Sequence, residues 1–194
     1  MGYGLFLFIR DVADGDLVAW IDRQLAAADG AAGPERLTGL VESLVGPLRH
    51  VHGVSDKVLM MALSNLLLAS TNPIWAEVGS GMIAIDTLVH NFLHRTGILD
   101  RLGASHPYGP ACYRPGGCAD IIRSVAAQID ARQFNRSFPA VFPRFVQHAI
   151  WRYCAQDQFN ICNGNRIDDR QPCQNGHCQL YQLCDRKQLI YKQF

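Results

Sequence analysis

The chain has 194 residues, of which 48% are hydrophobic, and its formal net charge is +1. This length is enough to bury a real core in one domain or slightly more, and the near-neutral charge neither supports nor excludes nucleic-acid binding, because a local basic patch matters more than the sum. The apolar run Leu5–Ile9 is too short to span a membrane and lacks the preceding basic stretch of a secretion signal, so we expect no membrane contact and an intracellular, cytoplasmic location.

Apolar and charged residues recur at helical spacing along most of the chain, and no convincing β-strand pattern is visible. The predicted fold class is therefore all-α. Glycine and proline residues separate the helical segments, and Pro73 is expected to end one of them. The predicted helices are 13–28, 35–50, a central helix around 59–67, 82–96, 118–132 and 143–157.

The segment Val51–Lys57 lies between two predicted helices and predicts a helix-hairpin-helix spanning residues 40–70. Gly53 allows a tight turn, and the start of the next helix presents free backbone N–H groups that can hold a phosphate. Such a turn can grip a DNA backbone without reading bases. The alternative is an ordinary αα corner with an exposed Lys57. The candidate DNA-binding residues are His52, Gly53, Val54 and Ser55.

Asp86 follows the apolar run Ile83–Ile85 near the start of the helix expected over 82–97. An apolar approach can partly desolvate a carboxylate and direct it into a cleft, which makes Asp86 a candidate catalytic residue. The alternative is a helix N-cap, a role that aspartate fills well. The two roles are compatible.

A glycine- and proline-rich loop over 103–117 follows, and its histidine, cysteine, aromatic and basic residues could line a base pocket or contact DNA. A plain surface loop is an equal alternative for this segment, which includes His106 and Cys112 and leads to Cys118. His90 and His94 are spaced i, i+4 on one helix face, a geometry that can bind metal, but no matching ligand is evident beside them in the sequence. Core or DNA-facing roles are therefore favoured for both.

Near the end of the chain, four cysteines are spaced C-x10-C-x4-C-x5-C in a polar segment. Four thiolates this close can surround a zinc ion or an iron-sulfur cluster. Unpaired or disulfide-bonded thiols are the alternative, which a reducing cytoplasm disfavours. The candidate metal ligands are Cys162, Cys173, Cys178 and Cys184, with Cys154 or His177 as a possible replacement for one of them.

Taken together, the hairpin His52–Lys57, the aspartate motif Ile85–Val89 and the terminal cysteines resemble the helix-hairpin-helix DNA glycosylases, in particular the endonuclease III-like branch with an iron-sulfur loop. The three motifs occur in the family's order. The chain departs from the family pattern at His52, where proline is usual, and at Ser55, where glycine is usual. The first two cysteine intervals are also longer than the family's six and two.

The resemblance implies a helical domain over 1–157 and a cysteine-rich metal lobe over 158–194. It implies a [4Fe-4S] cluster, with zinc as the alternative, and basic residues of that lobe, including Arg170 and Lys187, directed at phosphates. It also implies a monomeric, nucleoid-associated protein that acts on double-stranded DNA in base excision repair.

By the same resemblance, Lys57 would form a Schiff base in an AP lyase step and Asp86 would assist base excision. A monofunctional glycosylase and a non-catalytic helix-hairpin-helix DNA-binding protein with a structural metal lobe remain alternatives. A redox or zinc protein unrelated to DNA is a further alternative, and the excised base is not specified by the sequence.

Overall fold

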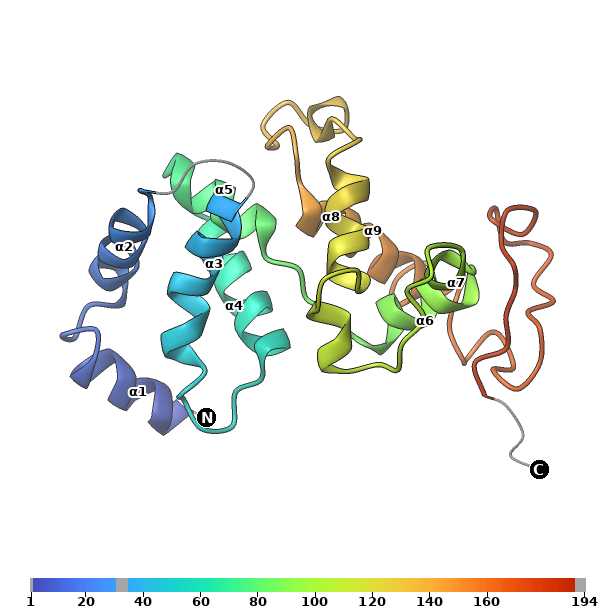
Figure 1. Ribbon diagram of the computed structural model, residues 1–194, viewed down its shortest axis with the longest axis horizontal. Coiled ribbons are helices and arrows are strands. Elements are labelled where there is room, and N and C mark those ends of the chain that lie inside the picture. Colours follow the sequence, from blue (N-terminus) through green and yellow to red (C-terminus); the bar gives the residue numbers. More distant parts are fainter. Residues whose placement is uncertain (1, 31–34, 191–194) are drawn as a thin grey trace. The chain divides into compact units, whose positions relative to one another are not determined.

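The computed structural model describes residues 2–30 and 35–190, and every regular element within these ranges is a helix (Figure 1). The all-α prediction is therefore confirmed. Contacts divide the chain into a first unit, Met1–Ala84 with Ala131–Arg144, and a second unit, Ile85–Asp130 with Phe145–Phe194. This division does not coincide with the predicted boundary at 157/158. The metal-binding role of 158–194 stays a prediction, and residues 191–194 lie outside the described ranges.

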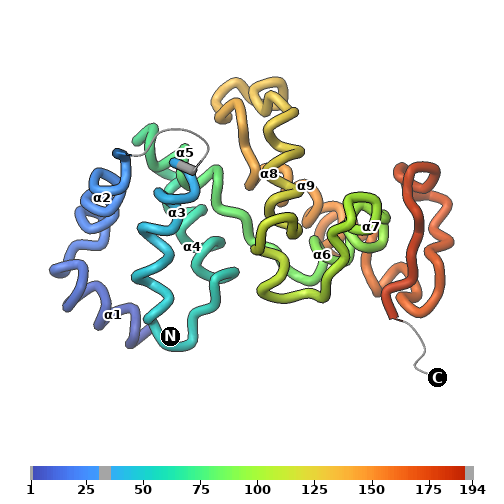
Figure 2. Tube along the Cα trace, in the orientation of Figure 1, coloured from blue at the N-terminus to red at the C-terminus, as the bar shows by residue number. Residues whose placement is uncertain are grey.

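Among its described residues, the N-terminal part of the first unit forms five α-helices that surround one hydrophobic core, and Figure 2 follows their path in blue to green. Asp16 caps the second helix, where its side chain accepts a hydrogen bond from Ala19 N at 2.9 Å. The buried core includes Trp20, Ile21, Leu25, Leu40, Leu44, Leu63, Leu67 and Trp75. The helices are α1 (Gly2–Asp11), α2 (Leu17–Ala28), α3 (Glu35–Leu48), α4 (Asp56–Leu68) and α5 (Pro73–Gly81).

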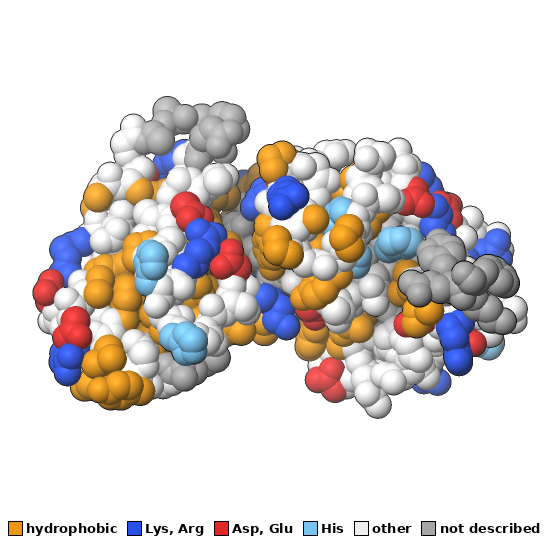
Figure 3. All heavy atoms as spheres, turned by 60° about the horizontal axis from the view of Figure 1, so that its bottom comes forward, with side chains coloured by type: hydrophobic (Ala, Val, Ile, Leu, Met, Phe, Trp, Pro, Cys, Tyr) orange, Lys and Arg blue, Asp and Glu red, His pale blue; other side chains and the backbone are white. Residues whose placement is uncertain are grey.

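Helix α1 was not predicted, and it contributes little to the core. Some hydrophobic side chains remain at the surface, as the orange atoms in Figure 3 show, and on α1 they include Tyr3 and Phe6. Phe8 is the buried residue of this helix, and its ring packs edge-on against Trp20 with centroids 5.1 Å apart. This aromatic contact helps to anchor α1, which also lies close to Val51 at Gly4.

Several predicted helix boundaries were wrong: the helix predicted over 13–28 begins only at Leu17, and that predicted over 118–132 ends at Ala126. The central helix does end before Pro73, at Leu68, but the helix that follows was not predicted. Pro73 begins this helix, α5, because proline is well suited to the first position of a helix and Asn72 caps it by accepting from Ile74 N at 3.1 Å. The helix predicted over 82–96 begins only at Thr87, since Met82–Asp86 are non-helical. A run of apolar residues fits a buried extended segment as well as a helix.

The predicted hairpin turn lies between α3 and α4. Gly53 adopts a left-handed conformation with φ of +79°, as its proposed role in a tight turn requires. Arg49 pairs with Glu42 and Asp56, so its charge is balanced by two carboxylates. Lys57 is half-buried in the first turn of α4, and it forms no ion pair with any described residue.

The second unit contains shorter helices and a long irregular C-terminal segment. The elements are α6 (Thr87–Arg95), α7 (Ile98–Arg101), the 3₁₀ helix η1 (Pro110–Tyr113), α8 (Cys118–Ala126) and most of α9 (Pro143–Cys154). The remaining 3₁₀ helix, η2 (Ala131–Gln133), belongs to the first unit. No helix in the ranges described here has both the length and the apolar character needed to cross a membrane.

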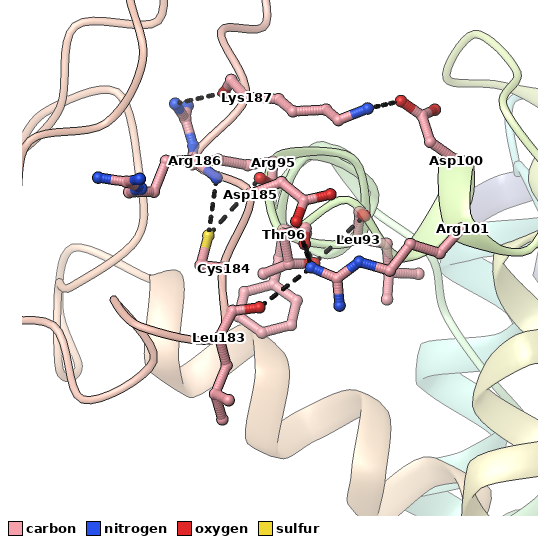
Figure 4. A network of polar contacts seen from close by, with 11 residues as sticks. Leu93, Arg95, Thr96, Asp100, Arg101, Leu183, Cys184, Asp185, Arg186 and Lys187 are labelled. Carbon is pink, nitrogen blue, oxygen red and sulfur yellow. Dashed lines mark hydrogen bonds and ion pairs between the residues drawn. The ribbon is translucent and has the colours of Figure 1, made fainter.

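The C-terminal segment docks onto the end of α6 and onto α7 through polar contacts (Figure 4). The Arg95 guanidinium is 2% exposed and pairs with Asp169. The backbone N–H of Lys187 donates to Arg95 O at 3.0 Å, and that of Asp185 donates to Thr96 O at 3.3 Å. The segment is therefore held through the carbonyl groups that end α6.

Side-chain ion pairs reinforce this docking. Arg101 pairs with Asp185, and its guanidinium also donates to Leu183 O at 3.1 Å. Lys187 pairs with Asp100 and Arg170 with Asp168. In this structure carboxylates of the same unit pair with both cations, and the contact of Lys187 and Arg170 with phosphates stays a prediction.

Replacement of Gly97 by alanine should weaken this docking. Gly97 has φ of +79°, and a Cβ there would overlap the Asp185 carboxylate, whereas Gly103 has φ of +64° and open space around it. We expect Gly103→Ala to lower the free energy of unfolding by about 1 kcal/mol from backbone strain alone. Gly97→Ala should lower the free energy of unfolding by about 2 to 4 kcal/mol, because overpacking against Asp185 is added to the same backbone strain.

Urea unfolding followed by circular dichroism measures both variants against the wild type. Equal losses for the two variants would contradict close docking of Asp185 on Gly97.

Candidate metal centre

Two histidines and two cysteines of the second unit converge on one point. They are His90 from α6, His106 from the following loop, Cys112 from η1 and Cys118 at the start of α8. One ligand atom from each residue lies within 4.8 Å of all the others, and no other such group occurs in residues 2–30 and 35–190. This group could hold a metal ion.

Local sequence explains how these ligands are brought together. Asp86 caps α6 and fixes where the helix begins, which places His90 one turn into it. Pro110 starts η1, and Gly117 precedes α8. A Cβ at Gly117 would lie 2.9 Å from Cys112 O and 3.0 Å from Arg114 O, so only glycine lets α8 begin this close to η1. Cys112 and Cys118 approach one another for this reason.

The distances between the ligand atoms match tetrahedral coordination. Cys118 Sγ lies 3.4 Å from His90 Nδ1 and 3.3 Å from His106 Nε2, and Cys112 Sγ lies 3.5 Å from His90 Nδ1. For zinc, bonds of about 2.3 Å to sulfur and 2.0 to 2.1 Å to nitrogen at the tetrahedral angle separate the two ligand atoms by about 3.6 Å. The observed separations are therefore close to those of an ion-bound site.

Hydrogen bonding and burial prepare the histidines for coordination. His106 Nδ1 lies 2.6 Å from Ala104 O, and because a carbonyl can only accept, Nδ1 carries the proton and Nε2 keeps its lone pair. Burial, together with the neighbouring His106 and His94, lowers the pKa of His90 to about 4. The lowered pKa favours the neutral imidazole of His90, the form that binds a metal ion, and the bond to Ala104 turns Nε2 of His106 toward the candidate site.

Both thiols of the group are buried, and burial favours the protonated form of Cys118. Cys112 and Cys118 are fully buried, and burial followed by the neighbouring Cys112 raises the pKa of Cys118. A bound cation reverses this preference, because it stabilises the thiolate and displaces the proton. Four protein ligands with three of them buried leave no open coordination position, which is typical of structural rather than catalytic metal sites.

Asp86 lies one helical turn before the metal ligand His90. Its Oδ1 accepts from Val89 N at 2.9 Å, so the N-cap alternative is confirmed. The side chain is half-buried, and the nearby Tyr108 phenol has a raised pKa because of burial and the Asp86 carboxylate. The cap bond does not test catalysis, so the catalytic role of Asp86 stays a prediction.

The predicted hairpin residues His52, Gly53, Val54 and Ser55 belong to the first unit, as does Lys57, whereas Asp86 belongs to the second. His52, Gly53 and Ser55 are exposed. Their predicted contact with DNA, and the joint action of Lys57 and Asp86, stay predictions.

The four C-terminal cysteines are free thiols in the second unit, but their ligand atoms do not gather as tightly as those around His90. Cys178 Sγ lies 3.1 Å from Tyr153 Oη, and Cys184 Sγ donates to Arg95 O at 3.6 Å. Cys154, named above as a possible replacement, hydrogen-bonds to Cys162 and, with the Arg95 charge, lowers the pKa of Cys162. Whether Cys162, Cys173, Cys178 and Cys184 bind a cluster stays a prediction.

Sequence reasoning noted all four residues of the metal centre but did not connect them. It paired His90 with His94, which is not part of the group, and it assigned His106, Cys112 and Cys118 to a base pocket or a surface loop. The regular spacing H-x5-C-x5-C was a usable signal, because it places three ligands at even intervals in one glycine-rich loop. Its fourth member lies on the preceding helix, sixteen residues upstream.

Comparison with protein-family models, with curated proteins and with solved structures finds no match for this chain.

Removal of one thiol should empty the metal centre. We expect Cys118→Ser and Cys112→Ser each to lower the metal content of the purified protein by about one ion per chain, because serine replaces thiolate poorly as a ligand to a soft ion. His94→Ala is the matched control, since His94 lies on the same helix outside the group, and it should keep the wild-type content.

Elemental analysis measures the metal content, and cobalt substitution with its thiolate charge-transfer absorbance identifies the ligands. Unchanged content in both cysteine variants would contradict a metal centre at this position.

Proposed function

We propose that this protein is a DNA glycosylase of the helix-hairpin-helix type, with Asp86 as its catalytic carboxylate. The observation that carries the proposal is the placement of Asp86 at the start of α6, directly after the buried residues Ile83–Ile85. The cap bond from Val89 fixes Oδ1, while Oδ2 makes no hydrogen bond with any described residue. One oxygen thus orients the carboxylate and the other is available to a substrate.

The proposed chemistry needs such a group. Cleavage of an N-glycosidic bond builds positive charge on the deoxyribose, and a fixed carboxylate near C1′ stabilises the oxocarbenium-like transition state or orients the nucleophile. The target nucleotide has to leave the stacked duplex, because C1′ and the base are otherwise shielded. Partial burial strengthens the electrostatic effect of Asp86.

The α3–α4 hairpin supports DNA as the partner. Its left-handed Gly53 and the uncapped N-terminus of α4 leave backbone N–H groups available to a phosphate. In the bifunctional reaction the neutral amine of Lys57 attacks C1′ as the N-glycosidic bond breaks and the base leaves, and the Schiff base that results loses the 3′-phosphate by β-elimination. No carboxylate of the described residues pairs with the amine of Lys57, whereas Asp100 pairs with that of Lys187.

We assign zinc to the centre of His90, His106, Cys112 and Cys118. A buried, four-ligand set of two nitrogens and two sulfurs suits Zn²⁺ and gives the ion a structural role. For the C-terminal cysteines, the sequence resemblance supports a [4Fe-4S] cluster, with zinc as the alternative. Four thiolates can bind either an iron-sulfur cluster or a zinc ion. The ligands of a cluster lie farther apart than those of a single ion.

A non-catalytic DNA-binding protein with structural metal sites is the second candidate. The cap bond of Asp86 favours it, because helix capping alone is a sufficient reason for an aspartate at this position. In this case the hairpin would hold DNA and no base would be released.

Asp86→Asn separates the two candidates. Asparagine also caps helices, so the fold should be retained while the negative charge is lost. We expect base release from a panel of duplexes with single lesions to fall at least about 100-fold, with DNA affinity changed less than about threefold. Asp16→Asn is the matched control, since it makes the same change at the N-cap of α2 and should keep full activity.

Gel-based cleavage assays and fluorescence anisotropy give the two measurements. If Asp86→Asn released the base at the wild-type rate from a duplex that the wild type processes, Asp86 would not be a catalytic residue.

Lys57 is tested by trapping. The chain has only three lysines, so few amines compete. We expect sodium borohydride to link wild-type protein covalently to lesion-containing DNA, and Lys57→Arg to lose this adduct while keeping its charge, because a guanidinium does not form a Schiff base under these conditions.

Adduct formation is measured by denaturing electrophoresis. An adduct of wild-type strength in Lys57→Arg would show that another amine reacts. Base release by the wild type without any adduct would indicate a monofunctional glycosylase.

A further inference from the structure

Two tyrosines from the metal-binding loop reach the backbone of one residue, Ile85. Tyr113 Oη accepts from Ile85 N at 2.9 Å and lies 3.4 Å from Ile85 O. Tyr108 Oη donates to the same carbonyl at 3.5 Å. Side chains of the loop therefore contact both the N–H and the C=O of the residue immediately before Asp86.

Ile85 needs these partners because of where it lies. It is 1% exposed and belongs to the non-helical segment that leads into α6. Neither its N–H nor its C=O forms a backbone hydrogen bond with any described residue. A buried backbone group without a partner is costly, so the tyrosine hydroxyls are what make this extended segment tolerable.

The metal ligands bracket the two tyrosines in the chain. Tyr108 comes two residues after His106, and Tyr113 directly follows Cys112. The ring of Tyr108 also lies beside that of the ligand His90, with centroids 5.8 Å apart. Apart from the four residues of η1, the loop from Gly103 to Gly117 has no regular structure. A metal ion bound to His106, Cys112 and Cys118 would fix the loop at three points around both tyrosines.

We propose that the metal centre positions Asp86 through Tyr108 and Tyr113. The ion fixes the loop, the hydroxyls hold Ile85, and Ile85 sets where α6 begins and how its capping carboxylate is directed. Tyr108 and Tyr113 are positioning residues, and the metal ion takes no part in the reaction. The catalytic consequence rests on the proposed glycosylase function, whereas the effect on Ile85 does not.

Amide hydrogen exchange of Ile85, measured by NMR, tests the mechanical part directly. We expect exchange to accelerate about tenfold or more in Tyr113→Phe with metal content unchanged, because the buried N–H loses its acceptor. Cys118→Ser should accelerate it similarly by releasing the loop. Tyr181→Phe is the control, since its hydroxyl accepts from Arg186 in the same unit, and it should leave Ile85 unchanged.

A rescue experiment separates positioning from general unfolding. Wild-type protein stripped with a chelator should show fast exchange at Ile85, and zinc alone should restore slow exchange. Amides in the middle of α9 report whether the unit as a whole has opened. The proposal would be overturned if the Ile85 amide still exchanged slowly in both Tyr113→Phe and Cys118→Ser. It would also be overturned if, in Tyr113→Phe, exchange accelerated as much in α9 as at Ile85.

Base release then distinguishes failure of the positioning from failure of the proposed function. With both correct, Tyr113→Phe lowers the single-turnover rate about tenfold at unchanged DNA affinity. Faster exchange in a protein that releases no base from any duplex supports the positioning and rejects the glycosylase. If the wild type is active and Tyr113→Phe exchanges faster at Ile85 but keeps the wild-type single-turnover rate, the catalytic consequence is rejected.

Discussion

Helix α6 is the constraint on which the second unit depends, because three different interactions fix its nine residues. Asp86 caps its first turn, His90 belongs to the metal centre in its middle, and Arg95 pairs with Asp169 at its end. The guanidinium of Arg95 is almost completely buried, and loss of the partner of a buried charge typically costs about 3 to 5 kcal/mol. The start, the middle and the end of this helix are thus specified separately.

The two units differ in what stabilises them. Helices α1 to α5 surround a continuous hydrophobic core with Leu40, Leu44 and Leu67 fully buried. The second unit has shorter helices, and residues 155–190 contain no helix or strand. A segment with few regular hydrogen bonds needs other cross-links, and ion pairs and carbonyl contacts hold residues 155–190 to α6 and α7. Elsewhere in the unit, an ion on the four candidate metal ligands would cross-link α6, the loop 103–117 and α8. Its stability is therefore expected to depend on metal and on salt more than that of the first unit.

The metal centre and the proposed catalytic carboxylate are linked by geometry. Asp86 and His90 lie on successive turns of one helix, and the loop that contributes His106 and Cys112 also contacts Ile85. A structural ion can affect a reaction in this way without touching the substrate, because it limits the conformations of the residues that do. The arrangement joins the zinc assignment and the glycosylase proposal, although each has its own test.

Features that depend on neighbours in the chain could be predicted from the amino-acid sequence. Helical spacing of apolar residues gave the all-α class, the turn at Gly53 followed from its freedom to adopt positive φ, and the cap at Asp86 followed from its position before Thr87. The sequence misplaced the start of α6, since a short apolar run such as Met82–Ile85 fits either an extended or a helical backbone. The packing of the loop against α6 brings His90 next to Cys118, 28 residues away, instead of His94 one turn away, and brings Tyr113 to Ile85. Ligand geometry depends on where loops return in space, and the spacing of residues along the chain does not contain that information.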